Sequence, residues 1–139
     1  MSADASMLIV EDNPDDVALL RRAFAKAAVD AEYAVARDGE AAITVLEDAA
    51  ARGSRPKVVL LDLKLPRRSG FEVLEWIRSH TSLRRVPVVI LTSSDTGSDL
   101  VRAYDLGANS YLVKPVLPAA LTAMVAQIDA YWLRLNAVA

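Results

Sequence analysis

Acidic residues, one hydroxyl residue and one lysine follow four short apolar runs of the sequence. In chain order they are Glu11 and Asp12 after residues 7–10, Asp62 after 57–61, Thr92 after 88–91 and Lys114 after 111–113. Carboxylates bind Mg²⁺, which prefers oxygen ligands, and a carboxylate can be the nucleophile that forms an aspartyl phosphate. A lysine and a hydroxyl group can bind the oxygens of a phosphoryl group. These residue types together indicate phosphoryl chemistry.

Each residue also has a simpler interpretation when it is taken alone. Glu11 and Asp12 fit a solvated loop before a helix, because Asp12-Asn13-Pro14 is a typical helix start. Asp62 is harder to explain in this way, since a carboxylate next to a buried strand is costly without a partner. The first 20 residues hold five acidic residues and no lysine or arginine. Crowded carboxylates repel one another, so we expect a cation near them.

Helical patterns separate the short apolar runs. Apolar residues recur every three to four positions from Val17 to Ala28, Ala42 to Ala50, Val73 to Ile77, Leu100 to Tyr104 and Leu121 to Leu135. The apolar runs do not alternate with polar residues, which is typical of strands covered on both faces. Strands that alternate with helices predict an α/β sandwich with a parallel sheet. Ligands of such folds bind at the carboxyl ends of the strands.

Composition excludes several classes of protein. The 139 residues predict a single domain, and the net charge of −2 argues against a nucleic-acid binder. Cysteine is absent, which excludes disulfides and thiol nucleophiles. The first apolar run is too short for a signal peptide, and no run is long enough to span a membrane. We therefore expect a soluble cytoplasmic protein that spans residues 1–139, with a core from about Met7 to about Leu135.

Five separated motifs resemble those of two-component response-regulator receiver domains. They are Glu11-Asp12, Leu61-Asp62, Pro66 to Gly70, Leu91-Thr92 and Lys114-Pro115. The spacings from Asp62 to Thr92 and to Lys114 also fit that family. The resemblance implies a flavodoxin-like (βα)5 fold with strand order 2-1-3-4-5 and leaves no room for an output domain.

The resemblance also implies a role for each site residue. Asp62 is expected to accept a phosphoryl group from a sensor histidine kinase. Mg²⁺ is expected on Glu11, Asp12, Asp62 and the backbone carbonyl of Lys64. Such a domain catalyses only its own phosphorylation and dephosphorylation.

The remaining roles concern the response to phosphorylation. Thr92 is the expected switch hydroxyl, Lys114 the expected contact of the phosphoryl group, and Tyr111 the expected switch aromatic. Tyr111 also fits a simple half-buried strand residue. The resemblance implies a cis peptide bond between Lys114 and Pro115.

A finer resemblance is to the stand-alone regulators that partner bacterial phytochromes. It rests on residues 11–16, 36–39, 91–94 and 108–111 and on the aromatic pair at 131–132. Two positions depart from the family's pattern. Lys64 stands where asparagine is frequent, and Ser94 leaves the path of the attacking water undefined.

Other functions fit the sequence less well. A haloacid-dehalogenase-type phosphatase needs a second acid two residues after its nucleophile, where this chain has Lys64. A nucleotide-binding loop needs clustered glycines, which are absent. A Ser–His–Asp hydrolase would need His80, which is expected at a helix end. The alternative that stays open is a phosphorylation-independent interaction module on the same fold.

The end of the sequence predicts self-association. One helix can hide only one inward stripe of apolar residues, and this segment carries further apolar residues, namely Tyr131, Trp132, Leu133 and Val138. Exposed aromatic residues often mark partner surfaces. We expect a two-fold homodimer with an interface at Tyr131, Trp132 and Leu133. Alternatively, Trp132 covers the edge of its own domain and Leu133 is a tolerated exposed residue.

Overall fold

Strands and helices alternate along the chain in the computed structural model, which describes residues 5–139. The strands are β1 (Met7–Val10), β2 (Tyr33–Ala36), β3 (Val58–Leu61), β4 (Val88–Thr92) and β5 (Ser110–Val113). The helices are α1 (Pro14–Lys26), α2 (Gly39–Arg52), α3 (Gly70–Ser79), α4 (Gly97–Asp105), α5 (Pro118–Ile128) and the π-helix η1 (Asp129–Leu135). All strand pairs are parallel, in the order β2-β1-β3-β4-β5. The predicted fold class and strand order are confirmed.

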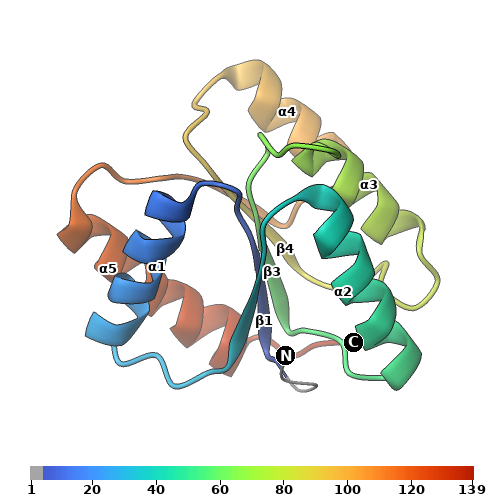
Figure 1. Cartoon of the computed structure of the whole chain (residues 1–139), viewed down its shortest axis with the longest axis horizontal. Coiled ribbons are helices and arrows are strands. Elements are labelled where there is room, and N and C mark those ends of the chain that lie inside the picture. The colour runs from blue at the N-terminus through green and yellow to red at the C-terminus, as the bar shows by residue number, and fades with distance from the viewer. Residues whose placement is uncertain (1–4) are drawn as a thin grey trace.

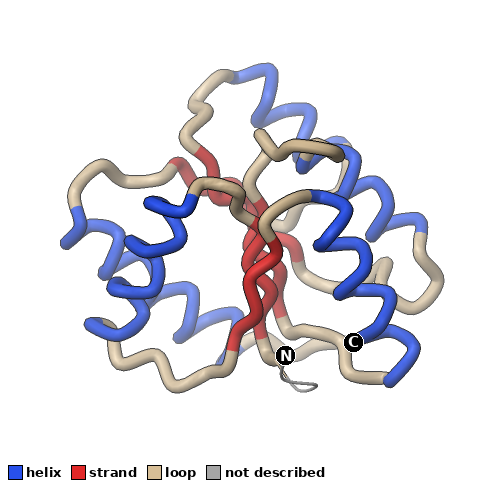
Figure 2. Tube along the Cα trace, in the orientation of Figure 1, coloured by secondary structure: helices blue, strands red, loops and turns tan. Residues whose placement is uncertain are grey.

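The sheet separates two apolar clusters. Within β1, Leu8 and Val10 belong to the cluster under α2, α3 and α4, whereas Met7 and Ile9 belong to the cluster under α1 and α5. Figure 1 shows α1 and α5 on one side of the sheet and α2 and α3 on the other. Figure 2 shows the strands as the central layer between these helices. Because both faces are covered, β1 and β3 are apolar at every position, and β4 is apolar at every position before Thr92.

Helix α4 packs more loosely than its sequence pattern predicts. Of its residues only Ala103 is buried. Leu100 and Tyr104, which belong to the same predicted apolar stripe, are 39% and 46% exposed. Helix α4 packs against β5, which is an edge strand of the sheet, so part of this stripe lies beyond the core.

The predicted fifth helix changes its hydrogen-bond pattern after Ile128. Residues 129–135 form the π-helix η1, and the Asn136 N–H donates to the Tyr131 carbonyl five residues back. A π-helix has more residues per turn than an α-helix, so the apolar stripe changes its direction. Leu133 is buried in the core, whereas Leu135 is 76% exposed. The expectation that Leu133 lies at a surface interface is therefore wrong.

The guanidinium of Arg78 links α3 to the amino ends of β4 and β5. This edge of the sheet lies opposite the carboxyl ends of the strands. It donates to the carbonyls of Val86 (2.7 Å) and Gly107 (2.8 Å) and to the Asn109 side chain (2.9 Å). These partners precede β4 and β5, so Arg78 fixes the amino ends of two strands. His80 ends α3 at its C-cap, as predicted.

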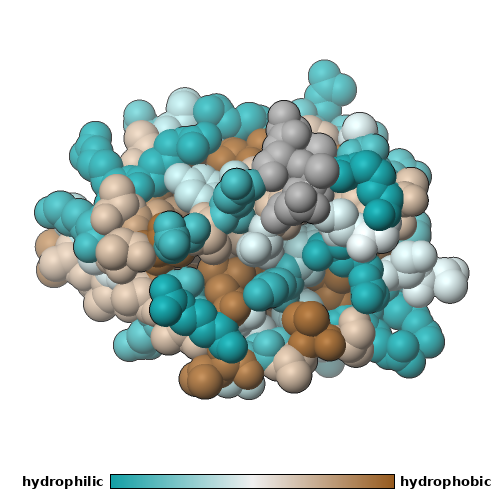
Figure 3. All heavy atoms as spheres, turned by 90° about the horizontal axis from the view of Figure 1, so that it is seen from below, coloured by the Kyte–Doolittle hydropathy of each residue, from teal (hydrophilic) through white to brown (hydrophobic). Residues whose placement is uncertain are grey.

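The surface near the start of β1 carries both hydrophilic and hydrophobic residues (Figure 3). Figure 3 shows separate apolar areas among hydrophilic residues on this face. Among the described residues, no helix is long and apolar enough to cross a bilayer.

Candidate functional site

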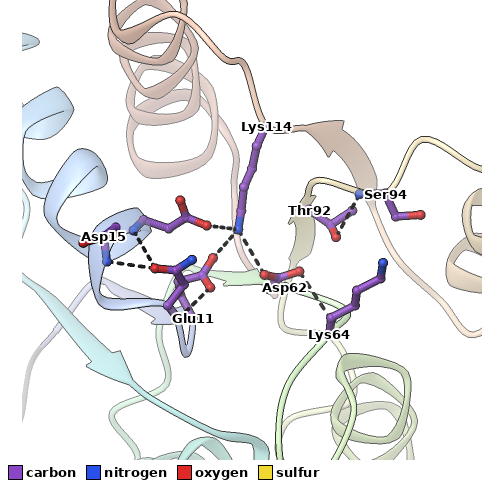
Figure 4. A network of polar contacts seen from close by, with 9 residues as sticks. Glu11, Asp15, Asp62, Lys64, Thr92, Ser94 and Lys114 are labelled. Carbon is purple, nitrogen blue, oxygen red and sulfur yellow. Dashed lines mark hydrogen bonds and ion pairs between the residues drawn. The ribbon is translucent and has the colours of Figure 1, made fainter.

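The structure brings the predicted site residues together at the carboxyl ends of the strands. Glu11 follows β1, Asp62 follows β3, Thr92 ends β4 and Lys114 follows β5. Because β1, β3, β4 and β5 are consecutive in the sheet, their ends form one continuous edge. Figure 4 shows the Glu11, Asp62 and Lys114 side chains pointing toward one another, with Thr92 beside them.

The ammonium group of Lys114 is the centre of the polar network. Nζ donates to Glu11 Oε1, to Asp62 Oδ2 (3.0 Å) and to Asp16 Oδ2 (2.9 Å). Burial lowers the pKa of Lys114, but the hydrogen bonds to Glu11 and Asp16 and the charge of Asp62 outweigh burial and raise the pKa above its ordinary value. A lysine ammonium has three N–H groups, so its donors are fully used.

Glu11 is the most deeply buried of these carboxylates. Only 2% of the residue is exposed. Burial raises the pKa of Glu11 from 4.5 to about 7, and the charge of Asp62 adds to the effect. The hydrogen bonds from Lys114 and from the Asn13 N–H (3.1 Å) act in the opposite direction. The protein therefore holds this carboxylate in an environment that disfavours its negative charge.

Three carboxylates of the site fit a divalent metal ion. One oxygen from each of Glu11, Asp12 and Asp62 lies within 4.8 Å of the others. Two of these groups are buried and Asp12 is exposed, so the cluster opens to solvent on one side. Oxygen ligands with negative charge suit hard cations such as Mg²⁺ and Mn²⁺. A bound cation would also relieve the repulsion among the carboxylates.

The start of α1 explains how Glu11 and Asp12 reach the site. Asn13 is the N-cap, and its side chain accepts hydrogen bonds from the N–H groups of Asp15 (2.9 Å) and Asp16 (3.4 Å). Pro14 occupies the first helical turn, where no N–H partner is needed. The chain therefore turns directly after Asp12 and leaves both acidic residues at the strand end. This helix start was predicted, so the helix and the acidic cluster coexist.

The loop after Asp62 depends on a glycine. A Cβ atom on Gly70 would lie 2.1 Å from the Asp62 carbonyl oxygen, which no side chain tolerates. The Gly70 N–H donates to the Leu63 carbonyl (2.8 Å), and Ser69 caps α3 together with Glu72. This close approach packs the first turn of α3 against the backbone that carries Asp62.

Lys64 lies in the same loop with its side chain exposed. Its N–H points to Asp62 Oδ1 at 3.4 Å. That the backbone carbonyl of Lys64 binds the metal ion stays a prediction.

The peptide bond between Lys114 and Pro115 is trans, like every other peptide bond of the described residues. The expected cis bond is therefore wrong, and Lys114 reaches the carboxylates without it.

Hydroxyl groups form a second chain of contacts beside the carboxylates. Thr92 is fully buried, and its Oγ1 accepts from the Ser94 N–H (3.4 Å). The Ser94 hydroxyl donates to Asp99 at the start of α4 (2.6 Å). Tyr111 donates from its hydroxyl to the Ser94 carbonyl (2.9 Å). The loop after Thr92 therefore connects β4, α4 and β5.

Asp16 is a site residue that the sequence interpretation did not single out. It was recognised only as part of the acidic N-terminal segment. The sequence does hold a signal for Asp16. A helix starts between Asp12 and Asp16, so Asp16 is expected on the first helical turn, close to the strand ends.

Comparisons with known proteins agree with this geometry. A family model described as "Response regulator receiver domain" matches residues 7–126. The probable methanogenesis regulatory protein FilR2 of Methanothrix harundinacea is 43% identical over 94% of this chain and 84% of its own length. Response regulator Rcp1 of Synechocystis is 37% identical over 91% of this chain and 88% of its own.

Solved structures show the same fold. The phosphorylated cyanobacterial phytochrome response regulator RcpA has a TM-score of 0.86 and 37% identity, with 95% of this chain and 96% of RcpA covered. The Mn²⁺-bound form of Rcp1 has a TM-score of 0.83 and 36% identity, with 96% and 97% covered. The chain belongs to the response regulator receiver domain family.

Proposed function

We propose that this receiver domain accepts a phosphoryl group on Asp62 from a sensor histidine kinase in a Mg²⁺-dependent reaction. The observation that carries the proposal is the 3.0 Å contact between Lys114 Nζ and Asp62 Oδ2 beside a cluster of three carboxylates. A nucleophile, a lysine ammonium and a carboxylate cluster that suits a metal ion thus share one partly buried edge. The domain then relays the signal by a conformational change and by protein contacts.

The proposed transfer needs few groups from the protein. An Asp62 carboxylate oxygen forms a P–O bond while the P–N bond of the donor's phosphohistidine breaks, and its electron pair returns to the imidazole. A divalent cation on Glu11, Asp12 and Asp62 supplies charge neutralisation of the phosphoryl oxygens when it is bound. Lys114 neutralises a further oxygen, and Thr92 offers its hydroxyl from the end of β4, the strand next to the one that Asp62 follows. Hydrolysis of the P–O bond by water then releases phosphate and restores the Asp62 carboxylate.

We propose Mg²⁺ as the physiological cation and the cytoplasm as the site of action. The ligand set of carboxylates contains no nitrogen or sulfur, which suits Mg²⁺. The domain is proposed to catalyse only its own phosphorylation and dephosphorylation.

The decisive experiment is phosphate incorporation from a small phosphodonor, with and without Mg²⁺, followed by intact mass. The wild type should gain one phosphoryl group and Asp62→Asn none, because the amide is nearly isosteric but is not a nucleophile. Undiminished incorporation into Asp62→Asn would exclude Asp62 as acceptor. Absence of incorporation into the wild type would favour a phosphorylation-independent interaction module.

We further propose a phytochrome-like histidine kinase as the partner. The support is the similarity to RcpA and Rcp1 over nearly the whole chain, together with motifs 11–16 and 108–111. Phosphotransfer from a purified phytochrome kinase, compared with an unrelated sensor kinase at equal concentration, tests this proposal. Equal rates from both kinases would contradict it.

We also propose a homodimer that uses the surface of β5, α5 and η1. An open groove of about 690 Å³ lies there, and Tyr131 and Trp132 pack edge-to-face at one end with ring centroids 4.8 Å apart. Tyr131 is 50% exposed, whereas Trp132 is half-buried against the core. The proposed interface therefore rests on Tyr131 and Trp132 and no longer on Leu133.

A further inference from the structure

Asp16 contacts Lys114, the same lysine that contacts the proposed acceptor Asp62. Asp16 does not belong to the three-carboxylate cluster that could hold a metal ion. Its Oδ2 accepts from Lys114 Nζ at 2.9 Å. The other two acceptors of this ammonium, Glu11 and Asp62, are members of the three-carboxylate cluster, and Asp16 is not. One of the three lysine contacts is therefore independent of the groups that would hold a metal ion.

The surroundings of Lys114 offer no replacement for Asp16. The Lys114 side chain is 16% exposed and borders a cavity of about 40 Å³. Within the described residues 5–139, Asp16 and Lys114 are the only charged residues that line this cavity, and its other walls are Pro115 and four leucines from α1, β4 and α5. An ammonium group that lost Asp16 would face apolar side chains on that side, where it is poorly solvated.

The backbone of Asp16 is held by the N-cap of α1. Its N–H donates to the Asn13 N-cap side chain at 3.4 Å, and it lies in the first turn of α1. Helices α1 and α5 pack together on the same face of the sheet, so α1 is held against the segment that follows Lys114. Asp16 therefore presents its carboxylate to Lys114 from a rigid element.

Phosphorylation must change the partners of Lys114. Its three donors are all used, so it can bind a phosphoryl oxygen only after it releases an acceptor. Glu11 and Asp62 are the acceptors that a metal ion and a phosphoryl group would engage. We infer that Asp16 is a positioning residue that holds the Lys114 ammonium at the site while its bonds to Glu11 and Asp62 are exchanged. This inference rests on the proposed phosphorylation of Asp62.

The neighbouring Asp15 provides a matched control. It has the same side chain, lies one residue away on the same turn and also donates its N–H to Asn13 (2.9 Å). Asp15 is exposed, and its carboxylate has no hydrogen bond or ion pair with Lys114. Asp15→Ala thus removes the same charge from the same helix end without touching the lysine.

The test compares rate constants for phosphorylation by acetyl phosphate at saturating Mg²⁺. Asp16→Ala should slow phosphorylation about tenfold, because a misplaced cation stabilises the transferring group less well. Asp15→Ala should change the rate less than about twofold, as expected for a screened surface charge. Asp16→Asn, which retains an acceptor oxygen without its charge, should fall between the two and provides a second variant in case Asp16→Ala folds poorly.

A double-mutant cycle shows whether Asp16 acts through Lys114. In a Lys114→Ala background, adding Asp16→Ala should cause no further loss of rate. The side-chain NH₃⁺ signal of Lys114 in ¹⁵N-edited NMR spectra of the metal-free protein should broaden in Asp16→Ala and persist in Asp15→Ala. Mg²⁺ affinity from calorimetry should decrease no more in Asp16→Ala than in Asp15→Ala.

The outcomes separate this inference from the proposed function. A wild type that takes up no phosphate contradicts the proposed function itself. A wild type that is phosphorylated, with equal rates in Asp16→Ala and Asp15→Ala, overturns only the role of Asp16. A further loss in the Lys114→Ala background, or a selective loss of Mg²⁺ affinity in Asp16→Ala, also overturns it, because Asp16 would then act on another group.

Discussion

The hydroxyl of Tyr111 donates a 2.9 Å hydrogen bond to the backbone carbonyl of Ser94. This bond joins the edge strand β5 to the loop that follows Thr92, so the aromatic side chain and the buried hydroxyl are linked through two residues of backbone. A movement of Thr92 toward the acceptor strand would displace the carbonyl that Tyr111 binds. The half-buried strand position and the proposed switch role of Tyr111 are thus compatible.

Thr92→Ala is expected to accept phosphate but to change conformation weakly. The substitution removes the hydroxyl that would move toward the phosphoryl group, whereas Asp62 and Lys114 stay in place. Inverting a 1:99 population requires a differential affinity of about 5.5 kcal/mol, so loss of one contact should leave much of the inactive state. NMR signals of the Tyr111 ring, recorded with and without a phosphodonor, report the shift. A Thr92→Ala protein that takes up no phosphate would show that Thr92 is needed for the chemistry.

Mg²⁺ should stabilise the wild type against heat. Binding only to the folded state adds RT ln(1 + [L]/Kd), which is about 2.7 kcal/mol at about 100 times Kd. Asp12→Asn should weaken this effect because it removes one of the three charges that hold the ion. Its metal-free melting temperature should stay equal or rise, since a source of repulsion is removed. Melting curves in millimolar Mg²⁺ check both results, and Asp15→Asn is the control; an unshifted wild-type curve would count against the metal site.

Glu11 should make the metal-free protein lose stability as the pH rises toward neutrality. The folded state raises its pKa from 4.5 to about 7. The fold therefore favours the protonated form, and this contribution to stability is fully present below 4.5 and is lost as the pH rises through about 7. Denaturant unfolding of the wild type and Glu11→Gln across this range, with a chelator present, measures the difference. Parallel stability curves for the two proteins would contradict the raised pKa.

The same shift predicts that Mg²⁺ binding releases protons. Metal ligands must be deprotonated, so Mg²⁺ affinity should increase with pH up to about 7 and then level off. Calorimetry in two buffers with different ionisation enthalpies measures the proton release directly. Glu11→Gln should show no such release.

Trp132→Ala should weaken the proposed dimer. Aromatic anchors carry a large share of interface energy, and loss of one commonly costs about 2 kcal/mol or more. Sedimentation velocity at tens of micromolar compares the wild type, Trp132→Ala and Tyr131→Ala. Val101→Ala, at an exposed position on α4 outside the proposed interface, serves as a surface control. If the wild type sediments as a monomer with and without a phosphodonor, the groove belongs to a different partner or to none.

The parallel sheet could be predicted because its signal is local. The central strands are covered on both faces. The run of residues 58–61 is apolar at every position, which predicts a strand that is buried on both faces. The edge on which Glu11, Asp62 and Lys114 meet follows from the rule that ligands of such sheets bind at the carboxyl ends of the strands. The strand order came from the resemblance to a known family. The roles of these residues came from the resemblance of their motifs to a known family.

The details that were missed depend on contacts between distant segments. The Asp16–Lys114 contact joins residues 98 positions apart, and no local pattern specifies it. The end of the chain was misjudged because the sequence gives no sign that Asp129–Leu135 adopts π-helical bonding, and the assumed 3.6-residue period placed Leu133 outside and Leu135 inside. In α4, Ala103 is buried whereas Leu100 and Tyr104 are partly exposed, and the periodicity of a helix does not encode which part of its apolar stripe the sheet covers.

The hydrogen bonds of Arg78 hold the edge of the sheet that lies opposite the phosphorylation site. Its guanidinium closes a ring of neutral carbonyl and amide partners at the amino ends of β4 and β5, and none of these partners changes charge when a phosphoryl group arrives. At the other edge, β4 ends in Thr92 and β5 is followed by Lys114, the two groups expected to contact a phosphoryl group on Asp62. A displacement at Thr92 or Tyr111 would therefore begin at the carboxyl ends of β4 and β5, while their amino ends keep the Arg78 contacts. We expect a phosphorylated domain to change shape where Thr92, Tyr111 and α4 lie, and to keep the Arg78 contacts at the opposite edge of the sheet.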